Sequence, residues 1–151
     1  MAGTGERIPA LTVDMILTID IGNTNITMGV FDGELLQARW RFATDAHRLP
    51  DEYALQLHGL FALKQINTEE LDAVAICSVV PPLTSVLQDA VRTLLGIEPF
   101  TVGSGTRTGI RVLYDSPKDV GSDRIVDAAA AYFYYGAPAI VVDFGTATVF
   151  D

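Results

Sequence analysis

Two segments of the chain repeat one pattern that suits phosphate binding. In each, an apolar run ends in Asp, and an apolar residue, a Gly and a small polar residue follow: Asp20-Ile21-Gly22-Asn23 and Asp143-Phe144-Gly145-Thr146. Glycine lets the backbone approach a ligand closely, and such a turn directs N–H groups at phosphate oxygens. The carboxylate suits a hard cation. Either turn alone is an ordinary strand-end turn, but the pair predicts a nucleotide held from both sides.

A third candidate lies between these turns, at Gly121-Ser122-Asp123-Arg124. An alanine-rich segment of helical character follows, so the simplest interpretation is a carboxylate that is favourable near a helix N-terminus. A chemical interpretation also exists, because a carboxylate beside a guanidinium can serve one substrate hydroxyl. The carboxylate would accept the hydroxyl proton, and the arginine would orient the substrate or stabilise phosphoryl charge. These residues alone leave both interpretations open.

Other common nucleotide motifs do not fit. The Gly-x-x-x-x-Gly-Lys-Ser/Thr pattern of a P-loop does not occur in the sequence. The glycine-rich segment 103–109 is not a dinucleotide fingerprint, because its third glycine comes one position late. The apolar surroundings of Cys77 predict a small core residue rather than a nucleophile.

Composition narrows the class of protein. The net charge of −9, from 19 acidic and 10 basic residues, speaks against a nucleic-acid surface, which needs a clustered basic footprint. The single cysteine permits no disulfide within the chain and fits a reducing compartment. No apolar run approaches the length of a membrane span, and the first fourteen residues lack the apolar stretch of a signal peptide. We therefore expect a cytoplasmic protein without nucleic-acid or membrane partners.

The elements that must position these residues follow from hydrophobic periodicity and turn signals. The predicted strands are 16–21, 26–31, 35–42, 71–80, 100–102 and a buried strand 139–144. Three helices are predicted. The first begins after Pro50, the second spans 83–94 and ends at Gly96, and the third spans 124–135 and ends at Gly136. Three antiparallel strands followed by β-α-β units make an α/β fold with a mixed sheet.

The motifs together carry a family resemblance. Paired Asp-x-Gly turns resemble the actin and hexokinase superfamily, in which two domains close around Mg-ATP. With Gly121 to Arg124 between them, and with Ser78-Val79-Val80-Pro81-Pro82 and Tyr114, the chain resembles type III pantothenate kinases from Met15 onward. The resemblance implies an actin-like (ribonuclease H-like) fold and transfer of the ATP γ-phosphate to the primary hydroxyl of pantothenate, the first step of coenzyme A biosynthesis. It also implies Mg²⁺, a monovalent cation (K⁺ or NH₄⁺) and a homodimer.

The same resemblance implies a division of the chain. Residues 1–14 would be an N-terminal extension, 15–138 the first actin-like domain, and 139–151 the start of a second domain that is truncated after Asp151. We expect the 151-residue chain alone to be nearly inactive and to self-associate.

Roles for individual residues follow from the resemblance as well. The first turn would bind ATP through Asp20, Ile21, Gly22, Asn23, Thr24, Asn25, Ile26 and Thr27. Asp20 would lie near Mg²⁺, directly or through water; Asp143 would bind the monovalent cation, and Thr146 would contact ATP. The pantothenate site would be lined by Tyr114, Gly121, Ser122, Asp123 and Arg124, with Asp123 as general base. The chain departs from the family at Val149, where a Thr is usual.

Two other functions remain open at this point. Relatives of the family have been described as accessory factors for transcription, so a non-catalytic regulatory protein is one alternative. The intact Gly121-Ser122-Asp123-Arg124 motif favours an enzyme, and the acidic balance disfavours direct DNA contact. The second alternative is an actin-like kinase for another small metabolite, which only a panel of substrates can separate.

Overall fold

Alternating apolar and polar residues build the central sheet. The computed structural model describes residues 14–145 and 147–151. Five strands form one sheet: β1 (Met15–Ile21), β2 (Asn25–Asp32), β3 (Leu35–Ala43), β4 (Ala73–Ser78) and β5 (Phe100–Thr101). Their order is β3-β2-β1-β4-β5; β1, β2 and β3 are antiparallel neighbours, whereas β4 runs parallel to β1 and β5 to β4. The predicted α/β class, with antiparallel strands followed by β-α-β units, is confirmed.

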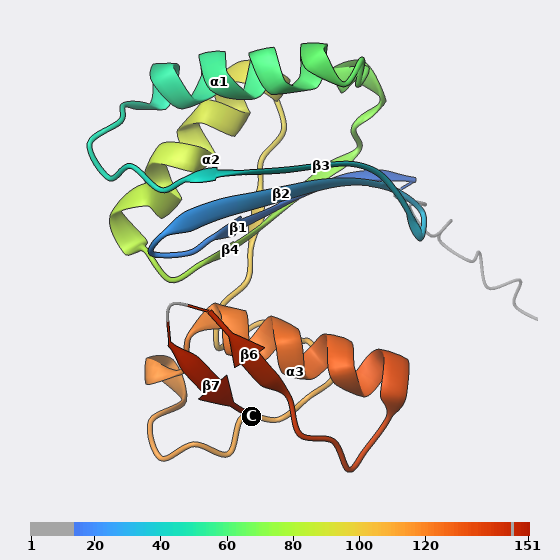
Figure 1. The fold of residues 1–151 in the computed structure, drawn as a ribbon, viewed down its shortest axis with the longest axis vertical. Helices are drawn as coiled ribbons and strands as arrows, with labels where there is room; N and C mark the ends of the chain where they lie inside the picture. The colour runs from blue at the N-terminus through green and yellow to red at the C-terminus, as the bar shows by residue number, and fades with distance from the viewer. Residues whose placement is uncertain (1–13, 146) are drawn as a thin grey trace, which may run out of the picture.

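Two helices cover one face of this sheet (Figure 1). They are α1 (Pro50–Leu63) and α2 (Pro81–Leu95). The alternate strand residues Leu17, Ile19 and Ile21 are buried beneath them together with Leu57 of α1 and Leu87 of α2. α2 ends where the sequence predicts, because Gly96 adopts a left-handed conformation (φ 67°) that glycine tolerates without strain.

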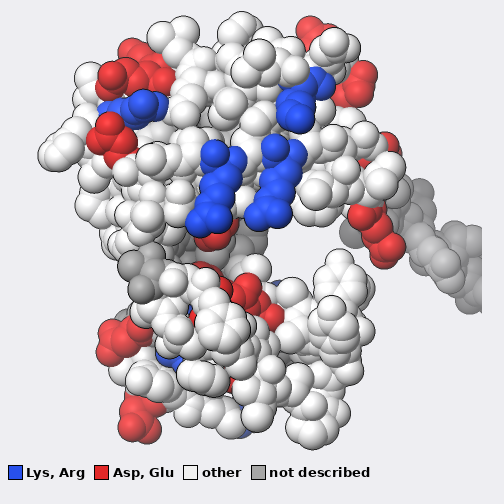
Figure 2. Space-filling view, viewed as in Figure 1, with Lys and Arg blue, Asp and Glu red and all other residues white. Residues whose placement is uncertain are grey.

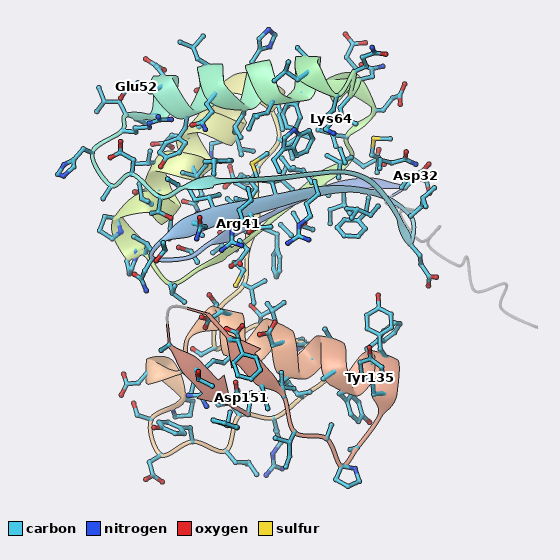
Figure 3. The ribbon with its side chains drawn as sticks, viewed as in Figure 1. Asp32, Arg41, Glu52, Lys64, Tyr135 and Asp151 are labelled. Carbon is cyan, nitrogen blue, oxygen red and sulfur yellow. The ribbon has the colours of Figure 1, made fainter. Side chains whose placement is uncertain are left out.

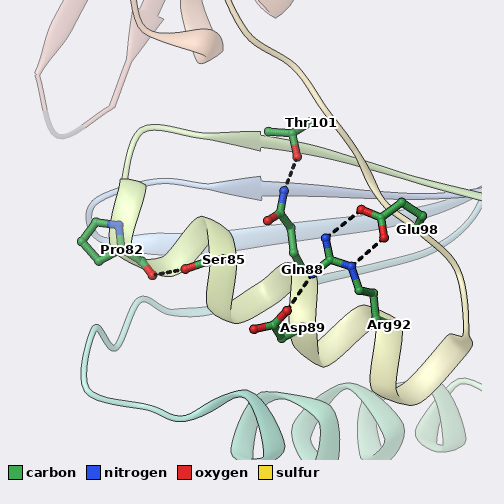
Figure 4. A network of polar contacts seen from close by, with 7 residues as sticks. All are labelled: Pro82, Ser85, Gln88, Asp89, Arg92, Glu98 and Thr101. Carbon is green, nitrogen blue, oxygen red and sulfur yellow. Dashed lines mark hydrogen bonds and ion pairs between the residues drawn. The ribbon is translucent and has the colours of Figure 1, made fainter.

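Side-chain contacts tie α2 to the edge of the sheet (Figure 4). Gln88 donates to Thr101 Oγ1 of β5 at 2.9 Å. Arg92 pairs with both oxygens of Glu98, at 2.6 and 2.7 Å, and with Asp89 at 2.7 Å. These bonds fix the short strand β5 at the end of α2, so that the parallel half of the sheet keeps its register.

The remaining elements lie on the other side of the sheet (Figure 1). They are α3 (Ser122–Tyr135), β6 (Val142–Phe144) and β7 (Thr148–Phe150), with short 3-10 turns at Thr68–Glu70 and Pro117–Asp119 elsewhere in the chain. α3 begins two residues earlier than its predicted start at 124, which places Asp123 inside its first turn. No helix within the described ranges has both the length and the apolar character needed to cross a membrane.

The prediction of a buried strand at 139–144 is wrong. Only Val142–Phe144 is a strand, all three residues are exposed, and the strand pairs with β7 in a separate two-stranded sheet rather than with the central sheet. An apolar run is buried only where a second layer covers it. In the described part of the chain β6 has a single strand neighbour and its side chains face solvent.

Candidate active site

The first predicted phosphate-binding turn (the first phosphate turn) joins β1 to β2 and is held in place by Thr44, which follows β3. Gly22 donates its N–H to the Asn25 carbonyl at 3.0 Å, and an added Cβ at Gly22 would also lie 3.0 Å from that oxygen. Thr44 binds the turn twice: its hydroxyl donates to the Gly22 carbonyl at 2.6 Å and its N–H to the Thr24 carbonyl at 3.0 Å. With these carbonyls occupied, the turn has a defined shape. Thr44 was not predicted from the sequence, because its partners Gly22 and Thr24 precede it by 22 and 20 residues.

The second predicted phosphate turn resembles the first but is one residue shorter, because three residues separate the paired ends Phe144 and Thr148 and four separate Ile21 and Ile26. It joins β6 to β7, and Gly145 donates its N–H to the Ala147 carbonyl at 3.1 Å. Asp143 lies directly opposite Val149 in the strand register, as Asp20 lies opposite Thr27 in the first turn. Val149 thus stands where the first turn carries a hydroxyl. Thr146, expected to contact ATP, lies outside the described residues.

Ser122 anchors the start of α3 to the end of β4. The side chain is 8% exposed, and its hydroxyl accepts the Ser78 N–H at 3.0 Å and donates to the Ser78 carbonyl at 2.7 Å. The Cys77 thiol donates to the Ser122 hydroxyl oxygen at 3.3 Å. β1 and β4 run parallel, so these contacts place the N-terminus of α3 at the carboxyl ends of both strands. Ligands of α/β sheets bind at that edge.

Removal of this anchor gives a first prediction. Ser122→Ala is expected to lower the free energy of unfolding by about 1–2 kcal/mol, because two backbone groups of Ser78 lose a partly buried partner. Thermal melting of the variant measures this loss. Ser85→Ala is the control, since Ser85 is exposed and donates only to the Pro82 carbonyl of its own helix. An equal loss in both variants would contradict an anchoring role.

Asp123 occupies the first turn of α3, next to this anchor. One of its carboxylate oxygens, Oδ1, accepts the Arg124 N–H at 2.8 Å. Its other oxygen makes no hydrogen bond to any residue that the structure describes, and so it can accept a proton from a ligand. Ser122, the residue before Asp123, binds Ser78 of β4, and Ser78 is paired with Ile21 at the end of β1. The structure therefore brings the predicted base close to the first phosphate turn.

Arg124 and Tyr114 meet at the outer side of the same helix turn. The Arg124 guanidinium lies 6.0 Å from the centre of the Tyr114 ring, which is 57% exposed. Arg124 also forms an ion pair with Asp151, in which its Nε donates at 2.6 Å. Sequence analysis did not predict this partner. The two predicted substrate residues are thus neighbours, with the guanidinium directed at a carboxylate.

Asp20, Cys77 and Val126 line a crevice between the central sheet and α3. Five carboxylates act on one another in this region: Asp20, Asp123, Asp127, Asp143 and Asp151. The pKa of Asp20 is raised, first by partial desolvation and then by the negative charges of Asp123, Asp127 and Asp143. A hydrogen bond with the Cys77 thiol lowers the same pKa, and Asp20 remains exposed to solvent. Desolvation, followed by Asp143, Asp123 and Asp151, raises the pKa of Asp127. Asp127 was not predicted from the sequence, although it follows Asp123 by one helical turn and so lies on the same face of the helix.

The raised pKa of Asp127 gives a prediction with a defined sign. An acid whose folded-state pKa is raised costs stability once it ionises, so the cost appears as pH rises above the unfolded value near 3.8. Asp127→Asn should therefore raise Tm at pH 7, by about 1–3 °C after solvent screening, and the gain should vanish below about pH 4. Melting curves across pH test this. Asp32→Asn, at the exposed end of β2 (Figure 3), is the control and should show no such gain. A gain independent of pH would contradict the charge argument.

Burial raises the pKa of the Cys77 thiol to about 11, chiefly through desolvation. At neutral pH the thiol is protonated and donates to Ser122. Its position agrees with the prediction that Cys77 is not a nucleophile.

Within the described residues, no three His, Cys, Asp or Glu side chains are arranged as ligands of one metal ion. This arrangement is compatible with Mg²⁺, which is typically bound by one or two carboxylates together with water and substrate phosphates. Asp20 and Asp143 each offer such a carboxylate at the end of a strand.

Comparison with known proteins identifies the family. A family model described as type III pantothenate kinase matches residues 16–151. Type III pantothenate kinases from Pelobacter propionicus, Roseiflexus sp. and Geobacter sulfurreducens are 48%, 51% and 49% identical over 137 residues. Each match covers 91% of this chain and 54% of the relative, so the chain spans about half the length of the curated relatives it matches.

A solved structure from Bacteroides thetaiotaomicron, a protein with an actin-like ATPase fold and unknown function, is also similar. Its TM-score is 0.46 at 11% identity, and the match covers 61% of this chain and 34% of that one. Because the family model matches almost all of the described residues, the chain belongs to the type III pantothenate kinase family.

Proposed function

We propose that the full-length protein transfers the γ-phosphate of ATP to the primary hydroxyl of pantothenate. The observation that carries the proposal is the closeness of two elements: the turn after Asp20, which suits a nucleotide, and the start of α3, where Asp123 offers a base for an acceptor hydroxyl. Ser122 of α3 binds Ser78 of β4, which is paired with Ile21 beside the turn. Membership of the family supplies the identity of the acceptor.

The proposed reaction uses each part of the crevice once. The turn from Asp20 to Thr27 binds the phosphates of ATP through its N–H groups, and Thr146 contacts the nucleotide from the second turn. Tyr114 and the segment 121–124 bind pantothenate. Asp123 accepts the proton of the primary hydroxyl as its oxygen attacks the γ-phosphorus. ADP leaves with the electrons of the broken bond.

Cations complete the proposed site. Asp20 would hold Mg²⁺, directly or through water, and Asp143 would hold K⁺ or NH₄⁺. Mg²⁺ supplies charge neutralisation for the phosphates when it is bound. The protein's part is to place these carboxylates at strand ends, where phosphate oxygens and water can provide the remaining ligands.

An assay of the full-length protein tests the function. ADP release with Mg-ATP should depend on added pantothenate and should be greater with K⁺ or NH₄⁺ than with Na⁺. A panel of other small hydroxyl compounds separates pantothenate from other acceptors. ADP release that no condition of pH or cation makes dependent on pantothenate would contradict the proposal and would leave a non-catalytic role or another metabolite.

We further propose that the full-length protein is a cytoplasmic homodimer, with 15–138 as its first domain and 139–151 as the start of its second. Support for self-association comes from the end of α3, where Phe133, Tyr134 and Tyr135 are 76%, 70% and 86% exposed. Patches of this kind are rarely left uncovered on a monomer. Light scattering should give the mass of a dimer at micromolar concentration. A monomer mass under those conditions would contradict the proposal.

A further inference from the structure

Two arginines of β3 point to the face of the sheet that α1 and α2 do not cover. Ala38 and Trp40 are buried on the helix side, and the Trp40 ring meets Phe61 of α1 edge-on with ring centres 5.6 Å apart. Side chains alternate along a strand, so Arg39 and Arg41 project from the opposite face. Figure 2 shows two adjoining basic side chains above the hollow in the middle of the molecule, and Figure 3 labels Arg41 there.

The strand register places Arg41 in line with the first phosphate turn. Arg41 is paired with Thr27 of β2, and Thr27 is paired with Asp20 of β1. Neighbouring strands are about 4.8 Å apart, so the Arg41 and Asp20 backbones are about 10 Å apart. Three residues after Arg41 comes Thr44, which binds the carbonyls of the turn. The last part of β3 and the residue after it thus serve the turn in two ways: Thr44 fixes its shape, and Arg41 places a positively charged guanidinium in the same row of the sheet.

Arg39 precedes Arg41 by two residues in β3, so it lies on the same face of the sheet but further from the turn. Its partner in the register is Gly29, and it lines a cavity of about 510 Å³ together with Asp20, Thr27 and Cys77. Val126 of α3 also lines the cavity, which therefore lies on the face of the sheet that α1 and α2 do not cover. An anion bound at the turn would therefore have both guanidinium groups on one side.

Neither guanidinium has a hydrogen bond or an ion pair within the described ranges 14–145 and 147–151. Of the other described arginines, Arg48, Arg92 and Arg124 each pair with a carboxylate, whereas Arg107 and Arg111 do not, in a chain of net charge −9. The two guanidinium groups lie two residues apart on one face of β3, and like charges at this spacing repel each other. Two unpaired neighbouring arginines beside a phosphate turn fit an anion that binds between them.

We propose that Arg41 binds the polyphosphate of the nucleotide held by the Asp20–Thr27 turn and stabilises the charge of the phosphoryl group during transfer, with Arg39 adding positive potential. This inference rests on the proposed function. In the step concerned, the bond from the γ-phosphorus to the bridging oxygen of ADP breaks and the bond to the acceptor oxygen forms, while the hydroxyl proton passes to Asp123. Arg41 is charged throughout and exchanges no proton.

Calorimetric titration of the full-length protein with ATP, ADP and AMP tests the binding part. Arg41→Ala should weaken the binding of ATP by at least about tenfold and that of AMP by less than about twofold, because AMP lacks the two outer phosphates. Arg41→Lys should recover only part of the loss, since an ammonium cannot bind two phosphate oxygens side by side. Arg39→Ala should have a smaller effect than Arg41→Ala.

Steady-state kinetics test the transfer part. Arg41→Ala should lower kcat by about 10²–10³-fold, the usual loss when one preorganised charge is removed from a transition state. Lys64→Ala is the control: it removes the same charge from the end of α1, on the opposite side of the sheet (Figure 3). Tm of every variant reports whether it folds.

The outcomes separate this inference from the proposed function. ATP affinity and kcat that stay at wild-type levels in Arg41→Ala would overturn the inference, as would equal losses for ATP and AMP or equal losses in Lys64→Ala. A wild-type protein that binds ATP but does not phosphorylate pantothenate would overturn the proposed function alone. In that case, a loss of affinity in Arg41→Ala that is selective for ATP over AMP still supports the role of Arg41.

Discussion

Asp123→Asn is expected to lower kcat for pantothenate phosphorylation by about 10²–10⁴-fold, the usual contribution of a general base. The amide cannot accept the hydroxyl proton. Its side-chain oxygen can still accept the Arg124 N–H that Asp123 Oδ1 accepts at 2.8 Å, so the first turn of α3 should stay intact. Measurement of kcat and Tm on the same full-length variant separates chemistry from folding.

A matched control exists in another helix. Asp51 is the second residue of α1, as Asp123 is the second residue of α3, and it lies on the far side of the sheet. Asp51→Asn makes the same chemical change at the same helix position and should leave kcat unchanged. If Asp123→Asn keeps kcat within threefold and loses only about 1 kcal/mol of stability, Asp123 is a helix-terminal residue and not the base.

Most of the fold could be predicted, because its elements are determined by local patterns. The alternation in β1 to β3, the apolar face of α1 and the glycine after α2 each depend on residues a few positions apart. The prediction of a buried strand at 139–144 was wrong for a different reason. Apolar character indicates that a segment can be buried, but a covering layer decides whether it is, and Val142–Phe144 has only β7 beside it in the described residues.

The same distinction applies to the candidate site: residues in short motifs could be predicted from the sequence, whereas contacts between distant segments could not. Asp20, Asp123 and Asp143 could be identified because each sits in a short motif, and their charges act together in the structure. Thr44 carries no motif and shapes the turn through a contact across β-strands. Ser122 was predicted to line the substrate site, and that role stays a prediction; the contact of its hydroxyl with Ser78 was not predicted. Contacts between distant segments depend on the tertiary fold, which periodicity does not describe. The roles carried over from the family, including that of Thr146, stay predictions.

Gly121→Ala should keep the fold and lower kcat by about 10²-fold, the usual loss when a catalytic group is displaced by about 1 Å. Gly121 precedes α3 with φ −57° and ψ 143°, a conformation that alanine adopts freely. An added Cβ would, however, collide with Asp123 Oδ1 and would lie 3.4 Å from Val79 Cγ1. The carboxylate is the end of a flexible side chain, so it moves while the backbone stays.

Gly105→Ala is the control for this variant, because an added Cβ there meets nothing within 4 Å. It should leave both kcat and Tm unchanged. The double variant Gly121→Ala, Asp123→Asn gives a sharper test. If the methyl group acts only by displacing the carboxylate, the double variant should be about as slow as Asp123→Asn alone, since residues that act as a unit are not additive. Losses that multiply would mean that Gly121 serves the reaction in another way, such as direct contact with the substrate, and that the position of Asp123 is not what the methyl group disturbs.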